Sequence, residues 1–157
     1  MTKTELKKTV VKIKKLLKKR DYGNIDTGIE LARGLDEPAV FETLLEGCSL
    51  DEEGRLTRNK IFIGTGPAQP YLDYALINLV CYAPDDTNLD EDLDRTNLKI
   101  LSISSSSWLE LPSGLTNLPN ITSLNLHYCS SLQNVDGLAN LPNITSLNLH
   151  YCRSLQN

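Results

Sequence analysis

A nearly identical duplication at the C-terminus constrains this chain more than any other feature. Residues 115–134 read LTNLPNITSLNLHYCSSLQN, and residues 138–157 read LANLPNITSLNLHYCRSLQN. The two copies lie 23 residues apart and differ only at Thr116/Ala139 and Ser130/Arg153. Internal repetition with a period in the twenties is typical of stacked repeat architectures. The duplication therefore predicts neighbouring units of the same local structure.

The 23-residue period extends one copy further towards the N-terminus. Apolar residues recur in phase at Leu98/Ile121/Ile144, Leu101/Leu124/Leu147, Ile103/Leu126/Leu149 and Leu109/Leu132/Leu155. We expect these side chains to form a shared core. The pattern predicts two full repeats and one incomplete repeat over residues 96–157, preceded by a separate N-terminal region over residues 1–95.

Each repeat contains an L-x-L segment that we expect to form a short strand. Alternation along a strand would turn Leu124 and Leu126 inward and the intervening polar residues outward. The outward positions, which we call the repeat face, form three rows: Ser102, Asn125, Asn148; Ser104, His127, His150; and Ser105, Tyr128, Tyr151. Exposed tyrosine is a common anchor at protein interfaces. The repeat face is thus a candidate partner-binding surface, and a duplicated surface without function is the alternative.

The pattern L-x-x-L-x-L-x-x-C, present in three in-phase copies, resembles the leucine-rich-repeat family in a bacterial or plant-intracellular-receptor-like variant. The resemblance covers about two-fifths of the chain. It implies a curved solenoid whose parallel strands line a concave face used for protein recognition, and it implies no catalytic residues. The expected fold is therefore α/β, a short leucine-rich-repeat solenoid with an all-helical N-terminal cap.

The sequence of the N-terminal region predicts that helical cap. Thr2 and Glu5 fit a capping box at the start of the first helix. Asn24 is expected to begin the second helix and Gly34 to end it. Residues 60–63 read as a short strand ahead of the first repeat, and the glycine pair in residues 63–67 as a loop without a complete phosphate-binding motif. Helices are predicted over residues 3–20, 24–33, 36–47 and 70–82.

Charge is distributed unevenly along the chain. Residues 1–20 contain nine Lys or Arg and one Glu, a charge of +8, so the remaining residues must sum to −12 to give the net −4. The Lys-rich helix could bind an anionic membrane or nucleic acid. However, its apolar residues Leu6, Val10, Ile13 and Leu17 are needed to close the cap. We therefore expect a solvated lysine face and favour neither membrane nor nucleic acid as the partner.

The remaining sequence features narrow the class of function. Four cysteines without C-x-x-C spacing favour free, inward-facing thiols and a cytoplasmic location. His127 and His150 are the only histidines and lack further expected ligands, so we predict no metal site. The sequence contains no G-x-S-x-G or H-E-x-x-H motif and no Cys/His pair with an activating partner, so we predict no cofactor and no catalytic residue. Trp108 occurs only in the first repeat and is expected to pack on the cap or a neighbouring loop, and a partly exposed anchor is the alternative.

We therefore expect a non-enzymatic protein-interaction module that binds a protein partner through the repeat face. One alternative is an adaptor that binds an anionic surface through the Lys-rich helix. Because the sequence stops at Asn157 inside a repeat, two further expectations arise. The chain is a fragment of a larger receptor or effector, or its open C-terminal edge pairs with a second copy.

Overall fold

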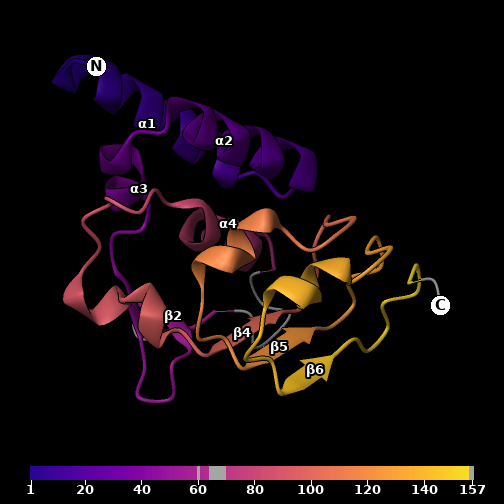
Figure 1. Cartoon of the computed structure of the whole chain (residues 1–157). Coiled ribbons are helices and arrows are strands. Elements are labelled where there is room, and N and C mark those ends of the chain that lie inside the picture. Colours follow the sequence, from indigo (N-terminus) through magenta and orange to yellow (C-terminus); the bar gives the residue numbers. More distant parts are fainter. Residues whose placement is uncertain (60, 64–69, 156–157) are drawn as a thin grey trace.

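The computed structural model describes residues 1–59, 61–63 and 70–155, which form a mixed α/β fold. Figure 1 shows α1 and α2 together as an outer layer, with α4 between α2 and the strands of the repeats. The strands β4, β5 and β6 then follow one another away from the helices. The α-helices in these residues are α1 (Lys3–Leu17), α2 (Tyr22–Leu35), α3 (Pro38–Leu44) and α4 (Pro70–Tyr82).

The first helix begins as the sequence predicts and ends earlier. The Thr2 hydroxyl accepts a hydrogen bond from the Glu5 amide at 3.1 Å, and the Glu5 carboxylate accepts one from the Thr2 amide at 2.8 Å. This reciprocal pair satisfies two amides that lack partners inside the helix. The helix ends at Leu17, so the predicted extension to residue 20 is wrong.

The predicted ends of the second and third helices are also wrong. Asp21, not Asn24, caps α2, because its carboxylate accepts the Gly23 amide at 3.0 Å. The helix continues through Gly34 to Leu35, and its C-cap residue Asp36 adopts a left-handed φ of 48°. Asp36 therefore terminates α2 and does not begin the next helix. The third helix runs over Pro38–Leu44 and stops before residue 47.

The expectation of an all-helical N-terminal region is wrong. The strands β1 (Cys48–Leu50), β2 (Leu56–Arg58) and β3 (Ile61–Phe62) form an antiparallel sheet in the order β1-β2-β3. Gly54 lies in the turn between β1 and β2 with φ of 82°, a conformation that favours glycine. Of the predicted strand over 60–63, Lys60 lies outside the described residues, as does most of the loop predicted over 63–67.

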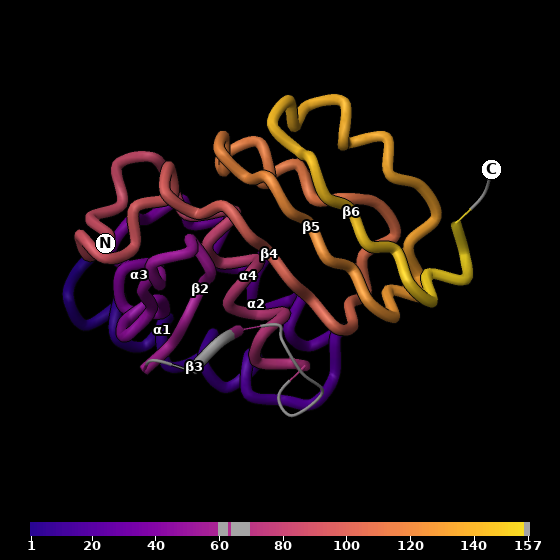
Figure 2. The backbone as a smooth tube through the Cα atoms, turned by 90° about the horizontal axis from the view of Figure 1, so that it is seen from below, coloured from indigo at the N-terminus to yellow at the C-terminus, as the bar shows by residue number. Residues whose placement is uncertain are grey.

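A second, parallel sheet joins the three repeats. It consists of β4 (Ile100–Ile103), β5 (Ser123–Leu126) and β6 (Ser146–Asn148), with Leu101 opposite Leu124 and Leu124 opposite Leu147. Paired residues are thus 23 positions apart, as the sequence period predicts. Figure 2 shows the strands side by side, with β6 farthest from the helices. The return segments carry the 3-10 helices η3 (Ser113–Asn117) and η4 (Asp136–Asn140).

The turn between β1 and β2 forms with the first repeat the same backbone hydrogen bonds that the repeats form with one another. The Gly54 carbonyl accepts the amides of Lys99 and Ile100 at 2.9 and 3.2 Å. The Lys99 carbonyl accepts the amides of Thr122 and Ser123 in the same way, at 2.8 and 3.1 Å. A methyl group at Gly54 would lie 2.7 Å from the Asn97 carbonyl oxygen, so only glycine fits this approach.

This arrangement corrects the expected position of the strand over 60–63. The strand β3 pairs with β2, whereas Arg55 forms the bridge to Ile100 of the first repeat.

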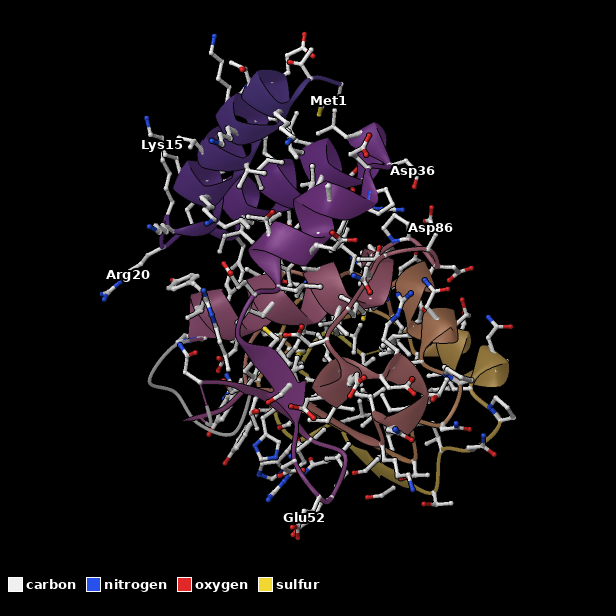
Figure 3. All side chains as sticks on the ribbon, turned by 90° about the vertical axis from the view of Figure 1, so that its left-hand side faces the viewer. Met1, Lys15, Arg20, Asp36, Glu52 and Asp86 are labelled. Atoms are coloured by element: carbon white, nitrogen blue, oxygen red, sulfur yellow. The ribbon has the colours of Figure 1, made fainter. Side chains whose placement is uncertain are left out.

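The Lys-rich face of α1 points away from the core. Val10, Ile13 and Leu17 are buried, which places the apolar side of the helix against its neighbours. Lys15 and Arg20 extend outward in Figure 3, while Glu52 marks the β1–β2 turn at the other end of the molecule. The positive end of the chain is therefore separated in space from this acidic turn.

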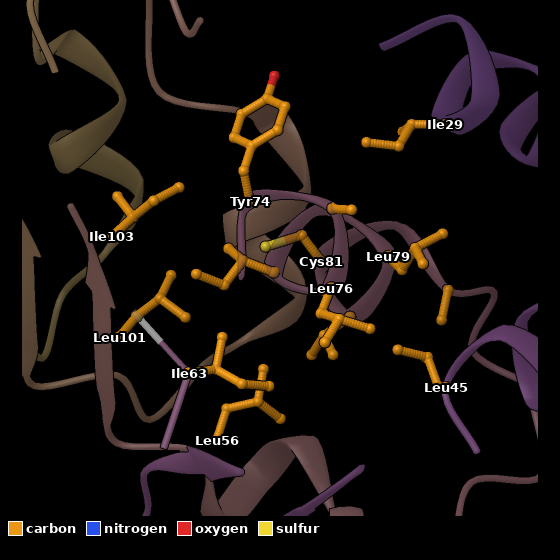
Figure 4. Packing of buried hydrophobic residues seen from close by; sticks show 14 of the residues in the cluster. Ile29, Leu45, Leu56, Ile63, Tyr74, Leu76, Leu79, Cys81, Leu101 and Ile103 are labelled. Carbon is orange, nitrogen blue, oxygen red and sulfur yellow. The ribbon is translucent and has the colours of Figure 1, made fainter. Parts of the chain in front are cut away.

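The fourth helix is the centre of the core. Nearly all of α4 is buried, including the polar residues Asp73 and Asn78. Figure 4 shows Leu101 and Ile103 of the first repeat strand facing this helix, with Ile29 of α2 on the other side. Apolar burial on all sides of α4 explains why its sequence lacks a polar face.

Two predicted core rows are only partly correct. In the row Leu101/Leu124/Leu147, Leu147 is 39% exposed at the outer strand β6, and the row Leu109/Leu132/Leu155 departs at its first member. Leu132 is fully buried, but Leu109, its counterpart one repeat earlier, is 58% exposed. Trp108 occupies the buried place instead, and its indole Nε1 donates to the Asn78 side-chain oxygen at 3.1 Å. This contact confirms that Trp108 packs on the N-terminal region. Turning Trp108 towards α4 leaves its neighbour Leu109 on the surface.

Candidate functional site

The first row of the repeat face follows the strand register. Ser102 pairs with Asn125, and Asn125 pairs with Asn148. Ser102 and Asn125 are half-buried, and Asn148 is exposed. The Asn125 side-chain oxygen is buried and accepts no hydrogen bond within the described part of the chain. A buried acceptor without a donor is costly, so Asn125 destabilises the fold at this position of the row.

Asn148 of the first row forms hydrogen bonds with both histidines of the second row. The Asn148 side-chain nitrogen lies 2.8 Å from His127 Nε2, and the Asn148 oxygen accepts the His150 amide at 2.9 Å. The two imidazole rings are 6.0 Å apart. In the residues that the structure describes, no group of three or more His, Cys, Asp or Glu side chains could hold a metal ion. Ser104, the first member of this row, is half-buried.

The tyrosine row forms the most exposed part of the repeat face. Tyr128 and Tyr151 adopt left-handed φ values of 56° and 60°, which turn the chain directly after each strand segment. Their rings stack with centroids 4.8 Å apart and planes within 9° of parallel. The side chains remain 55% and 46% exposed. Because Tyr128 and Tyr151 occupy the same position in adjacent repeats, their rings lie side by side and form one continuous aromatic surface.

Ser105 does not join this exposed aromatic surface. It is half-buried and forms a side-chain hydrogen bond with Tyr22 of α2. Burial raises the pKa of Tyr22, and the bond from Ser105 offsets part of that increase. The N-terminal region therefore covers the first position of the tyrosine row and leaves the next two open.

The cysteine position forms a buried row behind the tyrosines. Ser106 and Cys129 are buried and Cys152 is half-buried, in agreement with the predicted inward direction. The Cys152 thiol donates to the Leu126 carbonyl at 2.9 Å, which ties the third repeat to the second. Burial raises the pKa of Cys129 to about 11 and also raises the pKa of Cys152.

We expect Cys152 to react with a thiol reagent before the other three cysteines. Cys48, Cys81 and Cys129 are buried, and burial raises the pKa of each, to about 11, 12 and 11. A pKa increase of two lowers the reactive thiolate fraction at neutral pH about 100-fold. Timed labelling of the native chain should show one leading phase that Cys152→Ser removes and Cys129→Ser retains. Four fast native thiols, or fewer than four after denaturation without reductant, would contradict this.

A second set of polar residues was missed by the sequence reasoning. The Asp26 carboxylate accepts hydrogen bonds from the Tyr74 hydroxyl and, at 2.8 Å, from the Ser107 hydroxyl. This network adjoins a cleft of about 640 Å³ between α2, α4 and the segment 107–113. The residues of this network are far apart along the chain, so no local motif predicts it. The only signal in the sequence was Trp108, which occupies a position where the next two repeats have serine.

The described residues contain no helix of sufficient length and apolar character to cross a membrane. Comparisons with protein-family models, with curated proteins and with solved structures found no match to this chain.

Proposed function

We propose that residues 96–157 form a leucine-rich-repeat solenoid capped by residues 1–95, and that the protein binds a protein partner through the repeat face. The observation that carries this proposal is the stacked pair Tyr128 and Tyr151, which presents aromatic surface at a fixed spacing. Rigid aromatic side chains contribute much contact area for little loss of conformational entropy and are enriched among interface hot spots.

The chemistry of the repeat face favours a protein over a polyanion. Residues 98–157 carry only four charged side chains, Lys99, Glu110, Asp136 and Arg153, which sum to zero. Nucleic-acid affinity depends mainly on many cationic contacts to phosphate. A nearly neutral surface of tyrosine, histidine and asparagine instead offers stacking and hydrogen bonds.

The exposed lysine face of α1 supports a second candidate, an adaptor for anionic surfaces. A helix lying in a membrane interface must insert an apolar face. Val10 and Ile13 are already buried within the fold, so α1 offers its lysine face and a single exposed apolar residue, Val11. Binding through α1 would then be electrostatic and strongly weakened by salt.

Partner binding should fall more after Tyr128→Ala/Tyr151→Ala than after Lys14→Glu/Lys15→Glu/Lys18→Glu. Loss of two hot-spot tyrosines is expected to reduce affinity about tenfold or more. The measurement is retention of proteins from an extract of the source cells by the immobilised chain and its variants. Phosphatidylserine vesicles and duplex DNA, tested at two salt concentrations, report directly on the adaptor alternative.

Circular dichroism of both variants checks that each remains folded. Greater loss in the lysine variant, together with salt-sensitive binding to vesicles or DNA, would replace the proposed function by the adaptor. Retention that is unchanged in the tyrosine variant would exclude the repeat face.

A further inference from the structure

The cleft of about 640 Å³ shares no lining residue with the repeat face. Its walls come from α2, α4, the segment 107–113 and the 3-10 helices η3 and η4. Trp108, Tyr74 and Tyr82 contribute aromatic surface to it. Clefts of this size that combine aromatic walls with a few polar groups are typical ligand sites.

The floor of the cleft is fixed by buried hydrogen bonds. Tyr74 and Ser107 donate to the two carboxylate oxygens of Asp26. Asn78 holds the Trp108 indole through its side-chain oxygen and donates its nitrogen to the Tyr74 carbonyl at 2.8 Å. These bonds connect α2, α4 and the first repeat, so the cleft is formed before any ligand arrives.

The charge of the cleft is negative. Its lining contains four carboxylates and one guanidinium, a formal charge of −3. Arg33 is occupied, because it lies 3.0 Å from Glu30 and 3.9 Å above the ring of Tyr82. Asp26 is occupied by Tyr74 and Ser107. The exposed carboxylates Glu110 and Asp136 thus remain on the side formed by the repeats.

An exposed apolar side chain adjoins these carboxylates. Leu109 also lines the cleft and is 58% exposed, whereas Leu132 at the same position of the next repeat is fully buried. A single exposed leucine is ordinary. Here, however, it results from the rearrangement that turns Trp108 inward, and it lies directly before Glu110. The surface therefore combines an apolar contact with neighbouring negative charge.

We propose that this cleft binds a basic segment of a protein partner. An arginine or lysine side chain of that segment lies between Glu110 and Asp136, and a neighbouring apolar side chain covers Leu109. The negative charge repels nucleic acid and anionic lipid. The site is independent of the proposed function, because none of its residues belongs to the repeat face.

The test uses the peptide acetyl-Leu-Arg-Leu-Arg-amide and the indole N–H signal of Trp108 in ¹H–¹⁵N spectra. Trp108 is the only tryptophan in the chain, so this signal reports on the cleft alone. We expect a saturable shift that an acetyl-Leu-Glu-Leu-Glu-amide peptide does not produce. Glu110→Gln/Asp136→Asn should raise the Kd about two- to thirtyfold, the range for two exposed ion pairs. Leu109→Ser should weaken binding as well.

The matched control is Glu52→Gln/Asp86→Asn, which removes two exposed carboxylates outside the cleft. It should leave the Kd unchanged, as should Tyr128→Ala/Tyr151→Ala. If the tyrosine variant still retains its protein partner, the proposed function fails and this proposal is unaffected. If the peptide does not bind the cleft, this proposal fails and the proposed function is unaffected. Circular dichroism establishes that every variant is folded.

Three results would overturn the proposal. The first is a shift that does not saturate, or that the control variant loses equally. The second is equal binding of spermidine with no effect of Leu109→Ser, which would assign the cleft to small polycations. The third is a Trp108 signal that moves with protein concentration alone, which would assign the cleft to contact between two copies of the chain.

Discussion

Replacing Leu124 with alanine is expected to lower the free energy of unfolding by about 2–5 kcal/mol. Leu124 is fully buried in β5, between Leu101 and Leu147 in the parallel register. The truncation removes apolar contacts and leaves a cavity that the neighbouring repeats cannot fill completely. Urea unfolding followed by circular dichroism measures the change.

The repeat provides its own matched control in Leu147→Ala. Leu147 has the same sequence neighbours but is 39% exposed at the outer strand β6. Its truncation should cost about 1 kcal/mol, because less apolar surface is removed from the interior. Equal losses would show that Leu147 is covered in solution. Light scattering over a concentration series then determines whether a second copy covers it, as expected for pairing through the C-terminal edge.

Gly114→Ala should destabilise the protein by about 1–3 kcal/mol, the usual cost of overpacking. An added methyl group would lie 2.8 Å from the Cys81 carbonyl oxygen and 2.9 Å from the Tyr82 ring. Gly114 lies in η3, which packs directly on α4. The substitution would therefore separate the first repeat from the helix that covers it. Thermal and urea unfolding both measure this loss.

Gly137→Ala is the matched control at the equivalent position of the next repeat. There the nearest atom to the added methyl group is Leu111 Cβ, at 3.2 Å, and no backbone atom is as close. We expect a change within about 0.5 kcal/mol, because mild crowding opposes the reduced entropy of the unfolded chain. If Gly114→Ala is equally mild, close packing of η3 on α4 does not contribute measurably to stability.

The elements that the sequence predicted correctly are those determined by the repeat period and by long apolar runs. The 23-residue period predicted the parallel register, and the apolar run from Pro70 to Tyr82 predicted α4 with its observed ends. The antiparallel sheet was missed because strands of two or three residues are too short to show alternation. The start of α2 was misplaced because Asp21 and Asn24 are both good capping residues, and only the fold selects one.

A contact at the candidate sites was predictable only where its residues belong to neighbouring repeats of the sequence. The order of the rows on the repeat face was predictable, because neighbouring members are one period apart. The hydrogen bond between Ser105 and Tyr22 was not, since nothing local in either segment indicates the other. The same reason hid the cleft, whose floor joins Asp26, Tyr74 and Ser107 from three distant segments.

The carbonyl of Gly54 gives the first repeat a backbone partner of the same kind as the one that each repeat gives to the next. Duplication of one unit therefore creates an interface that already exists in the protein. The residues that differ between the two copies, Thr116/Ala139 and Ser130/Arg153, are all exposed, so the copies share one core. Addition or removal of one 23-residue unit would therefore leave the contacts of residues 1–95 with the first repeat unchanged.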